Sequence, residues 1–102
     1  MPYCYIVKCS DGTLYTGWTN DIDRRVKQHN AGQGARYTRI RRPVKLVYAE
    51  SLPDRAAAQK RELAIKRLPR AKKLALIHSH RRDAEKARRA QRTHMRVSAD
   101  SA

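Results

Sequence analysis

The chain has 102 residues, which is enough for one small domain with a single modest core. Its 24 Lys and Arg residues against 9 Asp and Glu residues give a formal net charge of +15, so we expect an acidic partner such as a nucleic acid. No run approaches the ~20 apolar residues of a membrane span, and the start lacks the regions of a signal peptide. We therefore expect a cytoplasmic protein with no membrane partner.

The first 17 residues predict a β-hairpin. Tyr3–Lys8 is aromatic and β-branched at its centre, which favours a strand, and Asp11-Gly12 favours a turn immediately after it. Residues 13–17 then return as the second strand. Tyr5 and Tyr15 lie on these two neighbouring strands.

A helix is expected next. Thr19 or Asn20 can serve as its N-cap, and the Asn-Ala-Gly sequence at 30–32 provides its stop. Arg25 and His29 are four residues apart, so they share one side of this helix.

The rest of the folded part continues with loop, strand and two helices. Residues 32–42 are basic and glycine-bearing and predict an exposed loop, and 44–49 predict a third strand. A helix is expected over 54–68, and Pro69 at a first helical turn opens another over 70–78. The order strand, strand, helix, strand, helix, helix indicates a small α/β sandwich.

The composition divides the chain at residue 78. Residues 1–78 form the expected domain, whereas 79–102 hold seven basic against three acidic residues and few large apolar ones. We expect that segment to be a basic, disordered or partly helical tail. Cys4 and Cys9 have the spacing of neither a zinc pair nor a redox pair, so free thiols are expected.

Five residues supply the groups that phosphodiester hydrolysis needs: an activated water, cations on the phosphate and a carboxylate for a divalent metal. Tyr5 and Tyr15, if they emerge on one face, would position or deprotonate the water. Arg25 would bind the phosphate with two hydrogen bonds, and His29 would relay a proton or bind phosphate. Glu62, which lies among basic residues, would hold Mg²⁺.

These residues lie in segments that resemble the GIY-YIG nuclease superfamily, and most closely its small single-domain bacterial members. The segments are CYI, LYTGWT and DIDRRVKQH, followed by the glutamate in AAAQKRELAIKRL. The likeness covers residues 3–77. It implies a three-stranded antiparallel sheet flanked by helices, in the order ββαβαα, and hydrolysis of DNA that depends on Mg²⁺ or Mn²⁺. It implies catalytic roles for the same five residues and leaves open which tyrosine is the base.

Further side chains are candidates for nucleic-acid contact. Aromatic rings can stack on unpaired bases, and arginine clusters beside a site can steer the backbone of DNA or of RNA. The candidates are Trp18, Lys27, Arg36, Tyr37, Arg39, Arg41 and Arg42.

Each candidate also has a structural explanation. Strand tyrosines commonly pack in a core, and Glu62 can serve simply as the i, i+4 partner of Lys66. The alternative function is a nucleic-acid-binding module that has the nuclease scaffold without turnover. A basic accessory protein of an RNA assembly fits the charge alone.

Overall fold

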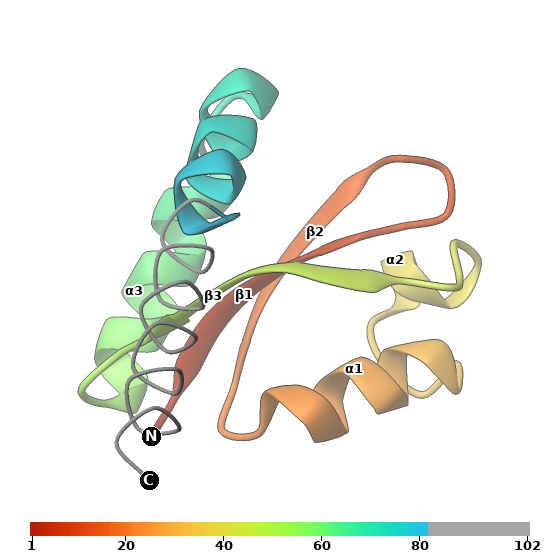
Figure 1. The fold of residues 1–102 in the computed structure, drawn as a ribbon. Coiled ribbons are helices and arrows are strands. Elements are labelled where there is room, and N and C mark those ends of the chain that lie inside the picture. The colour runs from red at the N-terminus through yellow and green to blue at the C-terminus, as the bar shows by residue number, and fades with distance from the viewer. Residues whose placement is uncertain (82–102) are drawn as a thin grey trace, which may run out of the picture.

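The computed structural model describes residues 1–81, and its centre is a three-stranded antiparallel sheet with the order β2-β1-β3 (Figure 1). This confirms the expected α/β class and sheet. The strands are β1 (Tyr3–Lys8), β2 (Leu14–Thr19) and β3 (Lys45–Ser51). The helices of the described part are α1 (Ile22–Asn30), α2 (Arg36–Arg39), α3 (Arg55–Lys66) and a further helix at 70–81.

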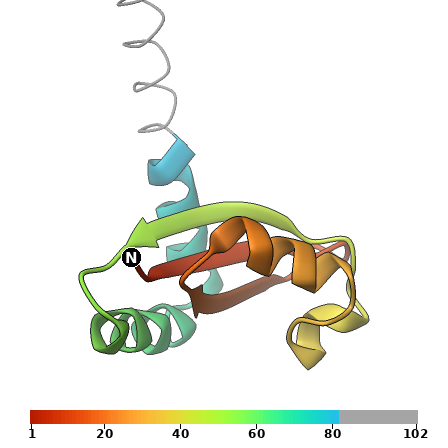
Figure 2. The ribbon, with the colours of Figure 1, turned by 90° about the horizontal axis from the view of Figure 1, so that it is seen from below.

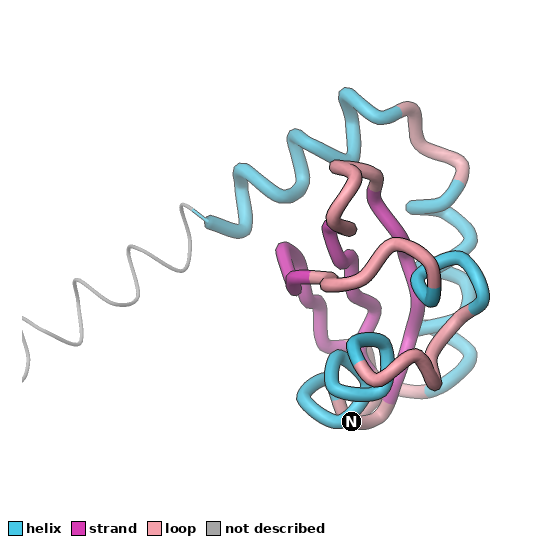
Figure 3. Tube along the Cα trace, turned by 90° about the vertical axis from the view of Figure 1, so that its right-hand side faces the viewer, coloured by secondary structure: helices cyan, strands magenta, loops and turns pink. Residues whose placement is uncertain are grey.

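The central strand is buried because helices cover both faces of the sheet. Alternate side chains of a strand point to opposite faces. Cys4 and Ile6 belong to the apolar cluster formed with α3 and the 70–81 helix, whereas Tyr5 and Val7 pack on the face of α1. Figure 1 shows α3 and the 70–81 helix on one side of the strands and α1 and α2 on the other. Figure 2 shows the same layers from below, and Figure 3 from the side of α1 and α2.

The start of α1 corrects one prediction. The N-cap is Asp21, whose carboxylate accepts from the Arg24 backbone N–H at 3.1 Å, and not Thr19 or Asn20. Thr19 instead extends β2, and its hydroxyl oxygen accepts from the backbone N–H of Asp21. The strand therefore runs to the residue that the sequence had suggested as a cap, and the helix starts later.

The segment 32–42 is not entirely loop, because it contains the one-turn helix α2. A single turn has little stability of its own, so neighbouring contacts must hold it. The Ala35 carbonyl accepts from the backbone N–H groups of Thr38 and Arg39 and from the Thr38 hydroxyl at 2.9 Å. Thr38 is fully buried against α1. The observed order is therefore ββααβαα, one short helix more than expected.

The last described helix crosses the expected domain boundary. It is continuous from 70 to 81, and His80 makes an edge-to-face contact with Tyr48 at 5.4 Å between ring centroids. The predicted tail over 79–102 therefore begins inside a helix, and its remainder lies outside the described residues. Cys4 and Cys9 are buried free thiols, as predicted. Within residues 1–81 no helix has the length and apolar character needed to span a membrane.

Candidate active site

The two candidate tyrosines lie on one face of the sheet. β1 and β2 pair so that Tyr5 stands opposite Gly17 and Val7 stands opposite Tyr15. Because side chains alternate along each strand, Tyr5, Val7 and Tyr15 all point toward the side of α1. The hairpin register therefore brings both phenols to the face that the helix covers.

The Tyr5 hydroxyl is the meeting point of the site. His29 Nε2 lies 2.8 Å from it, and Arg25 Nε lies 3.4 Å from it. Arg25 and His29 reach one atom because a spacing of four residues places them on one face of α1. Arg25 Nη1 also donates to Gln28 Oε1 at 3.3 Å, so two partners orient the guanidinium.

Two glycines leave the space that these side chains fill. A Cβ atom on Gly17 would lie 2.6 Å from the Tyr5 hydroxyl oxygen, and one on Gly34 would overlap His29 Nδ1. Tyr5 is only 1% exposed and His29 is fully buried, so neither ring has room to retreat. Gly17 is thus part of the site and does more than end a strand motif.

The hydrogen bonds around His29 run in one direction. The Thr38 hydroxyl donates its single hydrogen to the Ala35 carbonyl, so its oxygen accepts from His29 Nδ1 at 2.7 Å. A neutral imidazole with its hydrogen on Nδ1 presents a bare Nε2, which accepts from the Tyr5 hydroxyl. The Tyr5 oxygen accepts in turn from Arg25. We call this hydrogen-bonded line the relay; its members are Arg25, Tyr5, His29 and Thr38.

Burial sets the protonation states of the relay. Burial lowers the pKa of His29 below its usual 6.5, and the charge of Arg25 lowers it further. Burial raises the pKa of Tyr5 above its usual 10.0, although the hydrogen bond and charge of Arg25 oppose that rise. At neutral pH the pair is therefore phenol and imidazole, the combination in which Tyr5 donates and His29 accepts.

Tyr15 and Tyr37 pack beside the relay. The Tyr15 ring meets the His29 ring edge-to-face at 5.5 Å, and Tyr37 stacks on Tyr15 at 6.0 Å with 20° between the planes. The Arg41 guanidinium lies 3.9 Å from the centroid of the Tyr37 ring. These contacts anchor α2 beside the relay, and base stacking by the exposed Tyr37 stays a prediction.

Glu62 approaches the site from the other side of the edge strand. It lies on α3, which packs on β2 and β1, and its carboxylate accepts from Lys66 Nζ at 3.1 Å. The same ammonium lies 5.8 Å from the centroid of the Tyr15 ring. Burial is the main cause of the raised pKa of Tyr5, and the negative charge of Glu62 adds to it. Glu62 and the Tyr15 ring therefore share Lys66 as a neighbour.

Among the five predicted catalytic residues, Glu62 alone has a carboxylate, the group that suits a hard metal ion. Within residues 1–81 no three His, Cys, Asp or Glu side chains are grouped to share an ion. Mg²⁺ tolerates such a sparse protein shell, because it keeps several waters and takes phosphate oxygens of a substrate as further ligands. A partly buried carboxylate such as that of Glu62 is compatible with that mode of binding.

Arg25 also borders a hollow on the surface. Trp18 lines this hollow, and its ring lies 5.4 Å from the Arg55 guanidinium carbon. The other lining residues are Thr19, Asn20, Asp21, Arg24, Arg25 and Gln28. Trp18 and Arg25 therefore line the same hollow, and nucleic-acid contact by Trp18 stays a prediction.

The basic candidates around α2 differ in their surroundings. Arg41 Nε donates to the Asp11 carboxylate at 3.1 Å, and its Nη1 donates to the Tyr37 carbonyl at 2.9 Å. Its charge is therefore balanced within the protein. The candidates with exposed side chains are Lys27, Arg36, Arg39 and Arg42.

Thr38 and Gly34 belong to the site but escape sequence analysis. Both lie in the segment that the sequence describes as a loop, and no spacing rule connects a threonine to a histidine nine residues earlier. The closest signal is the pair of glycines at 32 and 34, since glycine often marks a close approach of the backbone to another group. That signal names neither the histidine nor the threonine.

Comparisons with known proteins identify the family of the chain. The family model described as the GIY-YIG catalytic domain matches residues 1–75, so the chain belongs to the GIY-YIG family. Its relatives include UPF0213 proteins. The protein CPE1444 of Clostridium perfringens is 57% identical over 79 residues, covering 78% of this chain and 85% of the relative. The protein SSP2268 of Staphylococcus saprophyticus is 59% identical over 75 residues, covering 74% and 92%.

Two solved structures share the fold. The NMR structure of the UPF0213 protein BH0048 from Bacillus halodurans has a TM-score of 0.50 and 46% identity, covering 76% of this chain and 84% of its own. The NMR structure of EF2693 from E. faecalis has a TM-score of 0.53 and 40% identity, covering 76% and 82%. The resemblance that the motifs predict is thereby confirmed.

Thr38→Val tests the direction of the relay. Valine keeps the branched shape but leaves the His29 Nδ1–H buried without an acceptor, so we expect a loss of about 1–3 kcal/mol in urea unfolding. Imidazole ¹⁵N NMR should show the Nδ1–H tautomer of His29 in the wild type and a mixture in the variant. Thr16→Val is the matched control, because the buried Thr16 hydroxyl has no hydrogen-bond partner. A wild-type His29 with its hydrogen on Nε2 would contradict the assignment.

The lowered pKa of His29 predicts a stability change in acid. The unfolded chain binds a proton near pH 6.5, whereas folded His29 binds it only at lower pH. Stability from this group is therefore complete above about pH 6.5 and declines as the pH falls toward the folded pKa. We expect the difference in free energy of unfolding between the wild type and His29→Gln to be smaller at pH 5.5 than at pH 7.5. An unchanged difference would show that the pKa is not lowered.

Proposed function

We propose that this protein is a metal-dependent endonuclease that hydrolyses phosphodiester bonds of DNA. Membership of the GIY-YIG family supports a nuclease with a nucleic-acid substrate. The observation that carries the proposal is the relay: a phenol that donates to a neutral, buried imidazole and accepts from an arginine. This arrangement can take a proton from a water at neutral pH while a guanidinium stands beside the reacting phosphate.

The proton moves along the relay. Water gives a proton to the Tyr5 oxygen as Tyr5 gives its own to His29 Nε2, and the hydroxide oxygen bonds to phosphorus. The bond from phosphorus to the leaving oxygen breaks, and that oxygen takes a proton from solvent. His29 becomes an imidazolium whose Nδ1–H remains bonded to Thr38. Because the pKa of Tyr5 is raised, the two transfers occur together and no free phenolate accumulates.

Arg25 has two tasks in this scheme. Its Nε–H stabilises charge on the Tyr5 oxygen, and its remaining N–H groups are available to the non-bridging phosphate oxygens. A fixed guanidinium suits both tasks because it needs no reorganisation as negative charge develops. Gln28 contributes by holding one guanidinium nitrogen.

The metal would be held by Glu62. GIY-YIG nucleases generally depend on a divalent ion, and Mg²⁺ or Mn²⁺ suits a carboxylate ligand. When bound, the ion would neutralise charge on the phosphate and the leaving oxygen. Lys66 keeps the Glu62 carboxylate oriented through its ion pair.

The substrate class is inferred from the charge and the structural elements of residues 1–81. Exposed cations near the site supply affinity for any nucleic-acid backbone, and Trp18 borders the hollow beside Arg25. Residues 1–81 contain little beyond the sheet and its helices with which to read base sequence. We propose cleavage that depends on DNA structure, such as a branch or damage, more than on sequence.

One observation favours a second function. The Tyr5 side chain is 1% exposed, and its pKa is raised by burial, so the hydroxyl is shielded from water in the free protein. If the Tyr5 hydroxyl stays buried when nucleic acid binds, the protein would bind nucleic acid without cutting it. The second candidate is therefore a nucleic-acid-binding module on the same fold.

A cleavage panel separates the two functions. Purified protein is incubated with duplex, single-stranded and branched DNA and with duplex RNA, in Mg²⁺, in Mn²⁺ and in EDTA. We expect metal-dependent cleavage of DNA. The cleavage rate should fall about 10²–10³-fold in Arg25→Ala, since removing one donor to a developing oxyanion has an effect of that size. A comparable fall is expected in Glu62→Gln.

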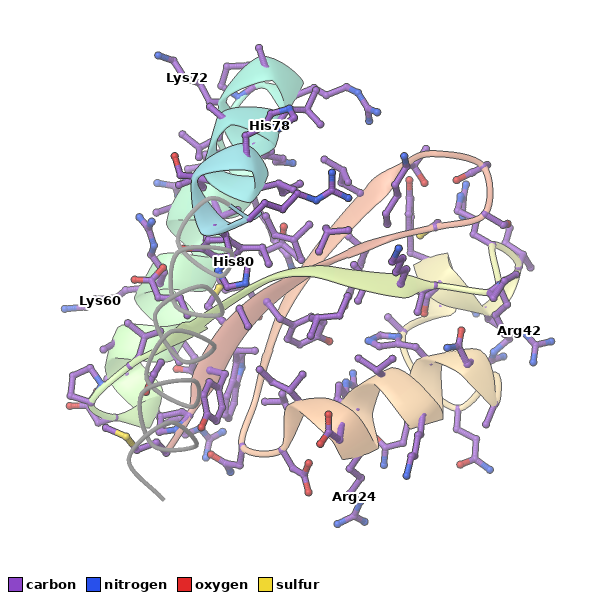
Figure 4. All side chains as sticks on the ribbon, viewed as in Figure 1. Arg24, Arg42, Lys60, Lys72, His78 and His80 are labelled. Atoms are coloured by element: carbon purple, nitrogen blue, oxygen red, sulfur yellow. The ribbon has the colours of Figure 1, made fainter. Side chains whose placement is uncertain are left out.

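Lys60→Ala is the control, because it removes the same charge as Arg25→Ala from a side chain that points away from the sheet (Figure 4). Cleavage that survives both Arg25→Ala and Glu62→Gln would identify a contaminant. Tight binding without a metal-dependent product would establish the binding module instead.

A further inference from the structure

The Arg42 side chain is held in place by carbonyl groups and not by a carboxylate. Its Nε donates to the Arg39 carbonyl at 2.9 Å, and its Nη1 donates to the Asn30 carbonyl at 3.3 Å. These carbonyls belong to the last residues of α2 and α1. A guanidinium has five N–H donors, so the two contacts orient the group and leave donors unused.

Gly32 allows this placement. A Cβ atom on Gly32 would lie 2.9 Å from Arg42 Nη1, closer than ordinary packing permits. Asn30 ties the same region to β3, since its amide group exchanges two hydrogen bonds with the backbone of Val44, at 2.7 and 3.2 Å. The Arg42 guanidinium is therefore preorganised against a fixed part of the fold.

A hollow opens beside this guanidinium and has no acidic residue in its lining. The residues that line it are Asn30, Arg39, Ile40, Arg42 and Pro43. Within residues 1–81 the three ion pairs are Arg41–Asp11, Arg61–Glu50 and Lys66–Glu62. Of three arginines close in sequence, only Arg41 is thus neutralised there, while Arg39 and Arg42 border the hollow with uncompensated charge.

The hollow is connected to the relay by short stretches of chain. Asn30 follows His29 directly, and Arg39 follows Thr38, whose hydroxyl accepts from that histidine. In Figure 4 Arg42 lies at the end of α1 near α2, on the opposite side of the sheet from Lys72. Two residues that line the hollow are therefore sequence neighbours of relay residues.

We propose that the hollow binds a second phosphate group of the nucleic-acid backbone, held by Arg42 and Arg39. This inference rests on the proposed function only in taking a nucleic acid as the ligand. The oriented guanidinium of Arg42 would bind two phosphate oxygens, and Arg39 would close over the same group. The site would fix how the backbone lies across the relay, which an exposed lysine on a flexible stem cannot do.

Arg42 also satisfies the carbonyls at the ends of two helices, which is a purely structural role. Arg39 has no such role, because its side chain is exposed and makes no hydrogen bond or ion pair within the described residues. Arg39→Ala therefore tests the phosphate site without disturbing the fold. Arg42→Ala tests the contribution of the oriented guanidinium.

The experiment measures binding without cleavage. Fluorescence anisotropy of a fluorescein-labelled 20-base-pair DNA duplex is recorded in EDTA over a series of salt concentrations. We expect each variant to weaken binding about tenfold, the effect of losing one charge-assisted hydrogen-bonded contact. We also expect the slope of log K against log salt to fall by about 0.9 in each, since one phosphate contact is lost.

Lys72→Ala is the matched control, with the same loss of charge far from the hollow, and should weaken binding less than twofold. Equal effects of Arg39→Ala, Arg42→Ala and Lys72→Ala would overturn the proposal, as would a loss of stability in Arg42→Ala with unchanged affinity. An RNA duplex with the same dependence on both arginines would support a phosphodiester site for RNA. Equal competition by polyglutamate at matched charge would show a general anion surface and overturn it.

The outcome is independent of catalysis. A wild type that binds DNA without cutting it, with both arginine variants weakened, would retain the phosphate site and reject the endonuclease. If the wild type cuts DNA and both variants bind DNA with the wild-type affinity, the phosphate site alone is rejected.

Discussion

The hydrogen bond between the Tyr5 hydroxyl and His29 Nε2 is the contact on which the rest of the site depends. Both groups are removed from water, so each polar atom needs a protein partner. That requirement explains why Thr38 must meet the second imidazole nitrogen and why α2, a single turn, exists at all. It also explains Gly17, since only a residue without Cβ lets the phenol lie where the imidazole can reach it.

The edge strand β2 lies between the two layers that carry Arg25 and Glu62. α1 supplies Arg25 on one face of the sheet, and α3 supplies Glu62 from the other, with β2 between them. An ion pair of 2.9 Å joins Arg61 to Glu50 of β3 and so limits rotation of α3 about its axis. Glu62 is adjacent to Arg61, so the same ion pair helps to fix the position of Glu62, the candidate metal ligand.

Sequence patterns predict the strands, the long helices and the sharing of one helix face by Arg25 and His29, because these follow from local periodicity. They do not predict α2, whose four residues are too few for a periodic pattern and whose stability comes from Thr38. The N-cap of α1 is misplaced because three consecutive residues all favour capping, and strand pairing decides among them. The contact of Gly17 with the Tyr5 hydroxyl is likewise a matter of register between strands, which single residues do not encode.

Replacing each tyrosine by phenylalanine tests whether the Tyr5 hydroxyl activates the water, because only a hydroxyl is removed. Single-turnover cleavage of DNA is compared for the wild type, Tyr5→Phe and Tyr15→Phe under identical metal and salt conditions. We expect the cleavage rate to fall about 10²-fold or more in Tyr5→Phe, the scale of general-base catalysis, and to fall less in Tyr15→Phe. Full activity in a folded Tyr5→Phe, with activity abolished in Tyr15→Phe, would contradict it and place the base on the second strand.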